Sequence, residues 1–364
     1  MTAEETPASS NDDTPTQAQT TTEALEWHAP VMVRIDEHTT IPHLLKERVQ
    51  RSATRPLILR KIGIGDTWRS ITAREFYDEV HALAAGLIAR GLEPGDRVAI
   101  MSRTRYEWTL LDFACWAAGL VPVPIYETSS IDQVAHVLVD ADATLIITET
   151  VSMAEIVRAA AHRENRENTH VLSLDSEAID TLIADGATVP RDRVLARSDA
   201  LTKDDIATIV YTSGTTGTPK GTVLSHENFT NLCLNAHAWM PEIAAYKNSR
   251  LLLFLPLAHV FARFLQVFQI SGNGVLGHAP NIKNLLPDLA SFRPSYLLVV
   301  PRVLEKIYNS ADTKARGPKR KIFRWAAKVA IAYSQALDTQ EGPSASLKAQ
   351  HALADKLVYQ QIIR

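Results

Sequence analysis

The most specific signal in this sequence is the segment Tyr211-Thr-Ser-Gly-Thr-Thr-Gly-Thr-Pro-Lys-Gly221. It follows an apolar run, Ile206–Val210, whose composition is typical of a buried parallel strand. Ser225 is a suitable N-cap for a helix that begins at His226. The sequence therefore predicts a loop rich in glycine and hydroxyl side chains between two regular elements.

The composition of this loop suits a polyphosphate ligand. Glycines let backbone N–H groups approach oxyanions closely, while hydroxyls donate further hydrogen bonds or ligate a divalent metal. Lys220 supplies a compact positive charge for the distal phosphates. Clusters of Gly, Thr, Ser and Pro are usually surface turns, and the residues alone leave that alternative open. A Walker A loop is excluded, because Pro219 stands where that pattern needs glycine and Gly221 follows the lysine.

These eleven consecutive residues resemble the phosphate loop of the acyl-adenylate-forming superfamily, which holds acyl-CoA synthetases, luciferases and nonribosomal-peptide adenylation domains. The resemblance implies that ATP binds here, that Lys220 is catalytic, and that Thr215 ligates Mg²⁺. The residues that it assigns to ATP are Thr212, Ser213, Gly214, Thr215, Thr216, Gly217, Thr218 and Lys220.

A second segment, Leu255–Arg263, resembles an acyl-pocket motif of long-chain fatty acyl-CoA synthetases. In that family a histidine lines the space between acyl pocket and nucleotide, which implies a catalytic and substrate-binding role for His259. Phe261 and Arg263 are further candidates for the acyl pocket. Some relatives carry a tryptophan gate near Arg263, so the difference here leaves gating open. The structural alternative for His259 is a hydrogen-bonded histidine at a helix start.

The resemblance implies a long-chain fatty acid–CoA ligase that uses ATP, Mg²⁺ and CoA. One alternative is a fatty acyl-AMP ligase that loads a carrier protein. Another is a binding module that holds nucleotide or lipid and catalyses nothing. The family's later Tyr-Gly-x-Thr-Glu segment and its C-terminal catalytic lysine have no match in this sequence. We therefore expect an N-terminal portion with little activity on its own.

Apolar runs alternate with amphipathic helices, which predicts an α/β fold with parallel sheets flanked by helices. The capping box Thr72–Glu75 marks one helix start. Residues 175–200 are charged and weakly periodic, which predicts a surface excursion. The strands are predicted at 56–61, 68–71, 98–101, 121–126, 145–148, 170–174, 206–210, 250–255, 275–276 and 296–300.

We predict a disordered tail over 1–24, an adenylate-forming N-terminal domain over 25–309, and a basic helical insert over 310–364. The domain divides into subdomains 25–200 and 201–309. Residues 312–328 hold seven basic residues and one acid, followed by an apolar helical face. Such a helix can lie on an anionic membrane, or it can pack on its own domain with a solvated basic face.

Composition limits the other classes of function. The net charge is −3, which gives no support for a nucleic-acid binder. The two cysteines, Cys115 and Cys233, lie far apart in apolar surroundings and indicate a reducing cytoplasm. The sequence has no signal peptide and no apolar run of the ~20 residues that cross a bilayer. We expect a cytoplasmic protein whose membrane contact, if any, is peripheral at the inner face.

Overall fold

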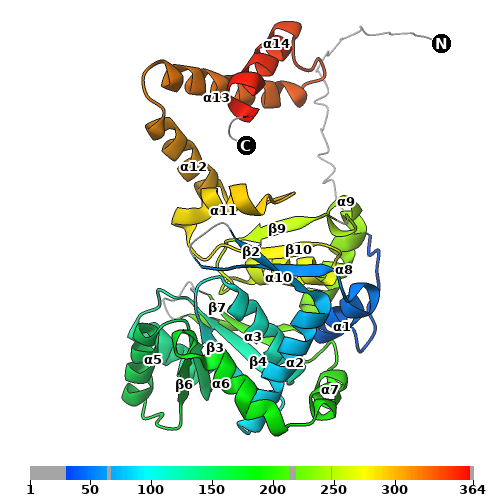
Figure 1. Cartoon of the computed structure of the whole chain (residues 1–364), viewed down its shortest axis with the longest axis vertical. Coiled ribbons are helices and arrows are strands. Elements are labelled where there is room, and N and C mark those ends of the chain that lie inside the picture. Colours follow the sequence, from blue (N-terminus) through cyan, green and yellow to red (C-terminus); the bar gives the residue numbers. More distant parts are fainter. Residues whose placement is uncertain (1–29, 64–66, 213–218, 247, 361–364) are drawn as a thin grey trace, which may run out of the picture. The chain divides into compact units, whose positions relative to one another are not determined.

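The computed structural model describes residues 30–63, 67–212, 219–246 and 248–360, and the account below concerns the unit that begins at Met32. Two four-stranded sheets and a hairpin lie within these residues (Figure 1). The first sheet has the order β4-β3-β5-β6, with every neighbouring pair parallel. Its strands are β3 (Arg97–Met101), β4 (Val121–Ile125), β5 (Leu145–Thr148) and β6 (His170–Ser173). The prediction of a parallel sheet is confirmed.

Helices cover both faces of this sheet, as the alternating pattern predicted. Val98 and Ile100 face a core shared with α2 (Ala73–Ala89) and α3 (Tyr106–Ala117). Ala99 and Met101 face the opposite core, which contains α4 (Ile131–Asp140) and α5 (Val151–Arg163). Successive side chains of a strand point to opposite faces of the sheet, so the central strand β3 is buried on both faces.

The second sheet has the order β2-β1-β10-β9, and only its edge strand β2 is antiparallel. Its strands are β1 (Pro56–Lys61), β2 (Trp68–Thr72), β9 (Arg250–Leu253) and β10 (Val275–His278). β1 and β2 come from the first predicted subdomain, whereas β9 and β10 come from the second. The predicted subdomain boundary near residue 200 therefore does not coincide with a boundary between sheets, because the second sheet takes strands from both sides of it.

Local capping signals fix several helix starts. Thr40 caps α1 (Ile41–Ser52), and the predicted capping box of Thr72 and Glu75 is present at α2. Ser225 caps α8 (His226–Trp239), as predicted. The remaining helices are α9 (Pro241–Ala244), α10 (Val260–Ser271), α11 (Leu285–Phe292), α12 (Pro301–Lys314), α13 (Pro318–Leu337) and α14 (Ala345–Ala354).

The segment 175–200 differs from the predicted surface excursion. It forms two helices, α6 (Ala178–Asp185) and α7 (Arg191–Ala200), each with an inward-facing side. Leu182 is fully buried, and Gly86 of α2 is in such close contact with its backbone that a side chain on the glycine would overlap it. Few apolar residues anchor these helices in a charged segment, so the periodicity was too weak to predict them.

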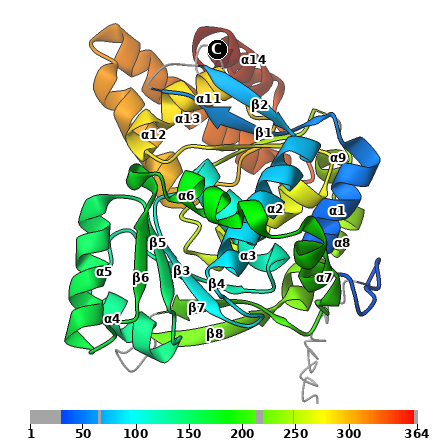
Figure 2. The same ribbon diagram turned by 60° about the horizontal axis from the view of Figure 1, so that its bottom comes forward.

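Two strand predictions also need correction. β7 (Ile206–Thr212) pairs antiparallel with β8 (Lys220–Ser225), not parallel (Figure 2). The two strands are too close in sequence for a parallel pairing, which needs a crossover connection of about a dozen or more residues. β7 also lies against β4, where the Thr208 hydroxyl donates to the Pro122 carbonyl at 2.7 Å. Residues 296–300 form a single bridge, between Leu251 and Tyr296, and no strand. Prolines at 294 and 301 flank this run and lack the N–H groups that a ladder needs.

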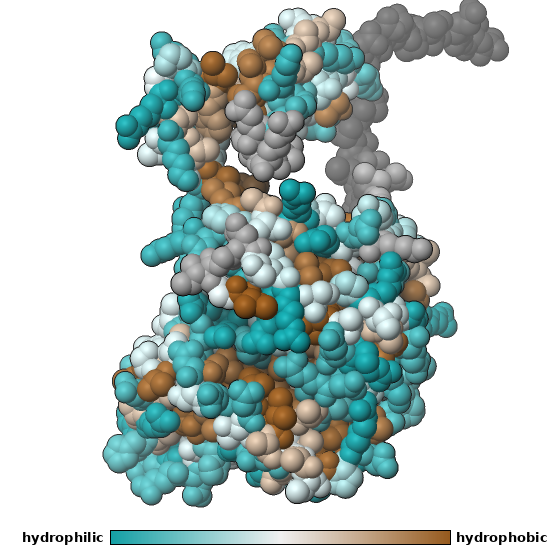
Figure 3. Space-filling model, viewed as in Figure 1, coloured by the Kyte–Doolittle hydropathy of each residue, from teal (hydrophilic) through white to brown (hydrophobic). Residues whose placement is uncertain are grey.

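α13 carries the predicted basic, amphipathic sequence. Ala326 and Val329 form a small buried cluster with Ala354 of α14, while Ile322 and Leu337 remain exposed. Apolar side chains reach the surface over these helices in Figure 3. Among the described residues, no helix is long and apolar enough to cross a membrane.

Candidate functional site

The β7–β8 hairpin places Thr212 and Lys220 opposite each other at the end of its ladder. These two residues flank the predicted phosphate loop. The predicted ATP ligands Ser213, Gly214, Thr215, Thr216, Gly217 and Thr218 lie outside the described residues. Their contacts, and the Mg²⁺ role of Thr215, stay predictions.

Helix α4 holds both sides of the hairpin. The Tyr211 hydroxyl donates to Asp140 Oδ2 at 2.6 Å, and burial raises the pKa of this tyrosine. On the returning strand, His136 Nε2 donates to the carbonyl of Pro219 at 2.8 Å. The His136 ring also meets the Tyr211 ring edge-on, with centroids 5.8 Å apart. Two residues of one helix thus fix the positions from which the loop departs and to which it returns.

Gly221 has a packing role that the sequence did not reveal. It lies opposite Tyr211 in the ladder, and a Cβ on it would come within 2.9 Å of Ile209 Cγ2 and 3.1 Å of the Tyr211 ring. Real Cβ atoms essentially never approach that closely. The glycine therefore makes room for the tyrosine that α4 anchors.

Lys220 is exposed at the start of β8, and none of the described acidic residues forms an ion pair with it. Thr212, across the ladder, is also exposed. An unpaired ammonium beside a hydroxyl can bind an anionic ligand without first breaking an internal contact. This arrangement fits the predicted phosphate site.

His259 caps the N-terminus of α10 through its ring. Its Nδ1 accepts a hydrogen bond from the backbone N–H of Phe261 at 3.2 Å. The neutral ring therefore carries its proton on Nε2, which is left to donate to a ligand. Phe261 is 42% exposed, so it also reaches the surface beside His259.

Thr104, in the loop after β3, positions the segment before His259. Its hydroxyl donates to the Leu255 carbonyl at 2.7 Å and accepts from the Leu257 N–H at 3.1 Å. A side chain that bonds both polar groups of a neighbouring segment fixes its path. The loop after β3 therefore determines where α10 begins.

The acyl-pocket role predicted for Arg263 is not supported, because the side chain is fully buried and engaged internally. Its guanidinium forms a bidentate pair with Asp112 of α3, with bonds of 2.7 and 3.1 Å. It also donates to the Thr208 hydroxyl of β7. Arg263 thus links the helix that carries His259 to the strand that leads into the phosphate loop.

Sequence reasoning missed a polar cluster at the carboxyl ends of β3 and β5. Glu149 is 2% exposed and accepts from the Arg103 backbone N–H at 2.8 Å and from its guanidinium. Burial acts to raise the pKa of Glu149, but the hydrogen bonds from Arg103 outweigh it and the pKa is lowered. β4 and β5 lie on opposite sides of β3, and ligands of open α/β sheets bind at such a switch in strand order. The sequence did hold a signal for this cluster, because Arg103 comes shortly after the predicted strand 98–101 and Glu149 directly after the predicted strand 145–148.

Within the described ranges, no group of three or more His, Cys, Asp or Glu side chains could hold a metal ion. Both cysteines are buried, as predicted, and burial raises the pKa of each thiol.

Known proteins resemble this chain in both sequence and fold. The AMP-binding enzyme family matches residues 45–346. The long-chain-fatty-acid–CoA ligase FadD15 of Mycobacterium bovis is 40% identical over 340 residues, which is 93% of this chain and 56% of that protein. The peroxisomal long chain acyl-CoA synthetase 7 of Arabidopsis thaliana is 31% identical over 321 residues, covering 84% of this chain and 43% of its own. This chain spans about half the length of the curated relatives it matches.

Solved structures share the fold. A fatty acyl CoA synthetase of Mycobacterium tuberculosis superposes with a TM-score of 0.61 at 25% identity, over 74% of this chain and 51% of that one. The N-terminal domain of FACL13 from the same organism gives 0.62 at 23% identity, over 77% and 68%. At 23% identity, the comparison with FACL13 supports the fold alone.

Proposed function

This chain belongs to the AMP-binding enzyme family, and from that premise we propose that it is part of a long-chain fatty acid–CoA ligase. In the proposed reaction a fatty carboxylate attacks the α-phosphate of ATP, giving acyl-AMP and releasing pyrophosphate. The thiol of CoA then attacks the acyl carbon and releases AMP. The substrate class rests on the 40% identical relative, which is named as a long-chain-fatty-acid–CoA ligase.

The proposal rests on the braced hairpin, at whose end the exposed Lys220 has no ion-pair partner among the described residues. A carboxylate is a weak nucleophile and both reactants are anions, so catalysis needs alignment and neutralisation of charge on the leaving pyrophosphate. Lys220 supplies that charge, and Tyr211 and Pro219 are held by α4 so that the loop has a fixed base. The Nε2–H of His259 donates to the anion that develops near the acyl group. Mg²⁺ bound with ATP would offset further phosphate charge, with Thr215 as the proposed ligand from this chain.

Titration calorimetry with α,β-methylene-ATP, a non-hydrolysable mimic of ATP that keeps the distal phosphates, tests this assignment. We expect Lys220→Ala to weaken binding about tenfold or more, since a hydrogen bond to a charged group contributes about 1.5–3 kcal/mol. Lys348→Ala is the matched control, because that lysine is exposed on α14, away from the hairpin. Equal affinity of Lys220→Ala and the wild-type chain would refute the proposed phosphate grip.

The acceptor and the completeness of the reaction need a second measurement. With palmitate and ATP, we expect these 364 residues alone to exchange pyrophosphate only weakly, since the relatives are about twice as long. Product analysis with CoA and with an acyl carrier protein separates the ligase from an acyl-AMP ligase. Binding of the mimic with no product under any condition favours the binding module.

We also propose peripheral membrane contact through α13. Lys319 and Lys321 are exposed at its start, whereas Arg320 and Arg324 are engaged with Asp312. The exposed Lys319 and Lys321, next to exposed apolar residues such as Ile322, suit an anionic lipid surface.

A further inference from the structure

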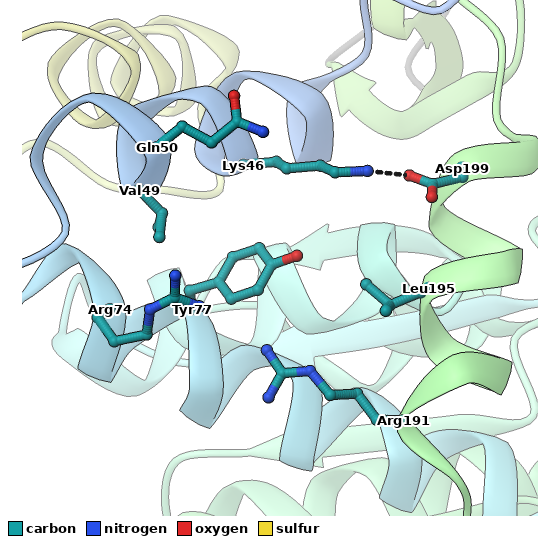
Figure 4. Close-up of a pocket in the computed structure, with 8 residues that line it drawn as sticks. All are labelled: Lys46, Val49, Gln50, Arg74, Tyr77, Arg191, Leu195 and Asp199. Carbon is teal, nitrogen blue, oxygen red and sulfur yellow. Dashed lines mark hydrogen bonds and ion pairs between the residues drawn. The ribbon is translucent and has the colours of Figure 1, made fainter.

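A hollow of about 260 Å³ lies between α1, α2 and α7 (Figure 4), and neither the hairpin strands nor His259 line it. Three cationic side chains, one phenol, the amide of Gln50 and the carboxylate of Asp199 surround it, and two aliphatic side chains form its wall. The other six lining residues are Lys46, Val49, Arg74, Tyr77, Arg191 and Leu195.

Tyr77 is the central feature of the hollow. The residue is 7% exposed, and its hydroxyl points into the hollow (Figure 4). The hydroxyl is open to the hollow, and none of the described residues forms a hydrogen bond with it. Burial raises the pKa of Tyr77, so the group stays protonated and can donate. A ligand oxygen placed in the hollow can accept this hydrogen bond without displacing a protein partner.

The Tyr77 ring is held in place from several sides. The guanidinium of Arg74 lies 5.6 Å from its centroid and that of Arg191 lies 5.7 Å away. The His81 ring packs on it with centroids 3.9 Å apart. The donor therefore has a fixed direction before any ligand arrives, which lowers the entropic cost of binding.

The charges around the hollow leave one positive charge unbalanced. Asp199 pairs with Lys46 at 2.8 Å, and Asp78 lies 3.0 Å from Arg191 and 3.9 Å from Arg74. Three cations thus face two carboxylates. A single negative charge completes the balance, whereas a polyphosphate would exceed it. Each guanidinium has five N–H donors, so contact with Asp78 leaves donors for a ligand.

The aliphatic wall and the size narrow the class of ligand. Val49 is buried, and Leu195 lines the same wall, so an ion without an apolar part would leave this wall unused. A water molecule takes roughly 30 Å³, so the hollow has the volume of about eight or nine waters. That space suits a carboxylate with a short hydrocarbon tail.

We propose that this hollow binds a small aliphatic monocarboxylate, with its oxygens on Tyr77, Lys46 and Arg191 and its tail against Val49 and Leu195. The ligand contacts three helices, of which α7 ends at Ala200, shortly before β7 begins at Ile206. Occupancy would therefore brace the segment that leads into the hairpin. The proposal is independent of the ligase assignment.

Calorimetric titration of the full chain with hexanoate tests the site. We expect Tyr77→Phe and Arg191→Gln each to weaken binding about tenfold, since each removes one hydrogen bond to a charged oxygen. Lys220→Ala, which alters the hairpin, should bind hexanoate as the wild type does. Tyr77→Phe keeps the ring and its packing, and an unchanged melting temperature shows that the fold is intact.

Two further probes separate charge from apolar contact. Hexanol, which lacks the negative charge, and inorganic phosphate, which lacks the tail, should both bind more weakly than hexanoate. The proposal is overturned if hexanoate does not bind, if Tyr77→Phe binds it unchanged, or if phosphate binds equally well.

Discussion

Replacing Arg263 with methionine should destabilise the chain strongly, although the residue contacts no solvent. Its side chain and that of Asp112 are 0% and 1% exposed, and two hydrogen bonds of 2.7 and 3.1 Å join them. Methionine fills much of the same volume but leaves the Asp112 carboxylate buried with no cation beside it. Breaking a buried pair from one side typically costs about 3–5 kcal/mol.

The double variant Arg263→Met with Asp112→Leu distinguishes a lost charge pair from a simple packing defect. It removes both charges, and well-packed apolar residues can replace a buried pair at little cost. We therefore expect the double variant to be more stable than Arg263→Met alone. Arg302→Met is the matched control, because its pair with Glu305 spans 3.9 Å and both side chains are exposed. That change should cost less than about 1 kcal/mol.

Urea denaturation of the four proteins gives the free energies of unfolding. Hydrogen exchange adds a local readout, since Arg263 donates to Thr208 and its loss should raise exchange in β7. The reasoning fails if Arg263→Met costs no more than Arg302→Met. It fails equally if the double variant is no more stable than Arg263→Met alone.

Three other perturbations test separate features. Burial lowers the pKa of His226 and of His278 from 6.5 to about 4, so the stability that each neutral ring contributes is present above pH 6.5 and is lost as pH falls toward 4. At about 1.4 kcal/mol per pKa unit, each histidine contributes roughly 3 kcal/mol in this way. Between pH 7 and pH 4.5, urea titrations should therefore show that His278→Asn loses less unfolding free energy than the wild type. Gly86→Ala should lower the melting temperature and increase exchange in α6, because its Cβ would overlap the α6 backbone. Lys319→Glu with Lys321→Glu should reduce cosedimentation with anionic liposomes, and the loss should shrink at high salt.

Each of these has a clear contrary result. Equal acid sensitivity of His278→Asn and wild type would contradict the histidine linkage. Unchanged melting of Gly86→Ala would mean that α2 and α6 can separate without cost. Undiminished liposome binding would remove the membrane proposal.

Much of the fold could be predicted from helix caps and apolar runs, which involve residues close together in the sequence. The capping box at Thr72 and the caps at Thr40 and Ser225 mark helix starts because each bonds its own first turn. The parallel strands were predictable because burial on both faces gives continuous apolar runs. These features depend on neighbours in the sequence, so the sequence alone was enough.

The rest depends on contacts between distant segments. Asp112 and Arg263 are 151 residues apart, and nothing in either segment indicates the other. The antiparallel return of β8 was missed because an apolar run such as Ile206–Val210 does not reveal the direction of its partner. The hydrogen bond from His136 of α4 to the Pro219 carbonyl was also missed, because it joins residues that are 83 positions apart. Motif resemblance predicted site roles for Lys220 and His259, and these roles stay predictions, whereas the groups that position the two residues were not predicted.

The mixed origin of the second sheet affects how the chain can be made. Ile58 of β1 pairs with Leu276 of β10, so 218 further residues must be added after Ile58 before this partner is complete. At a ribosomal pace of roughly 5–20 residues per second, β1 waits about 10 to 40 s for that neighbour. During translation the early β1–β2 ribbon therefore offers one open edge to chaperones and to other nascent chains.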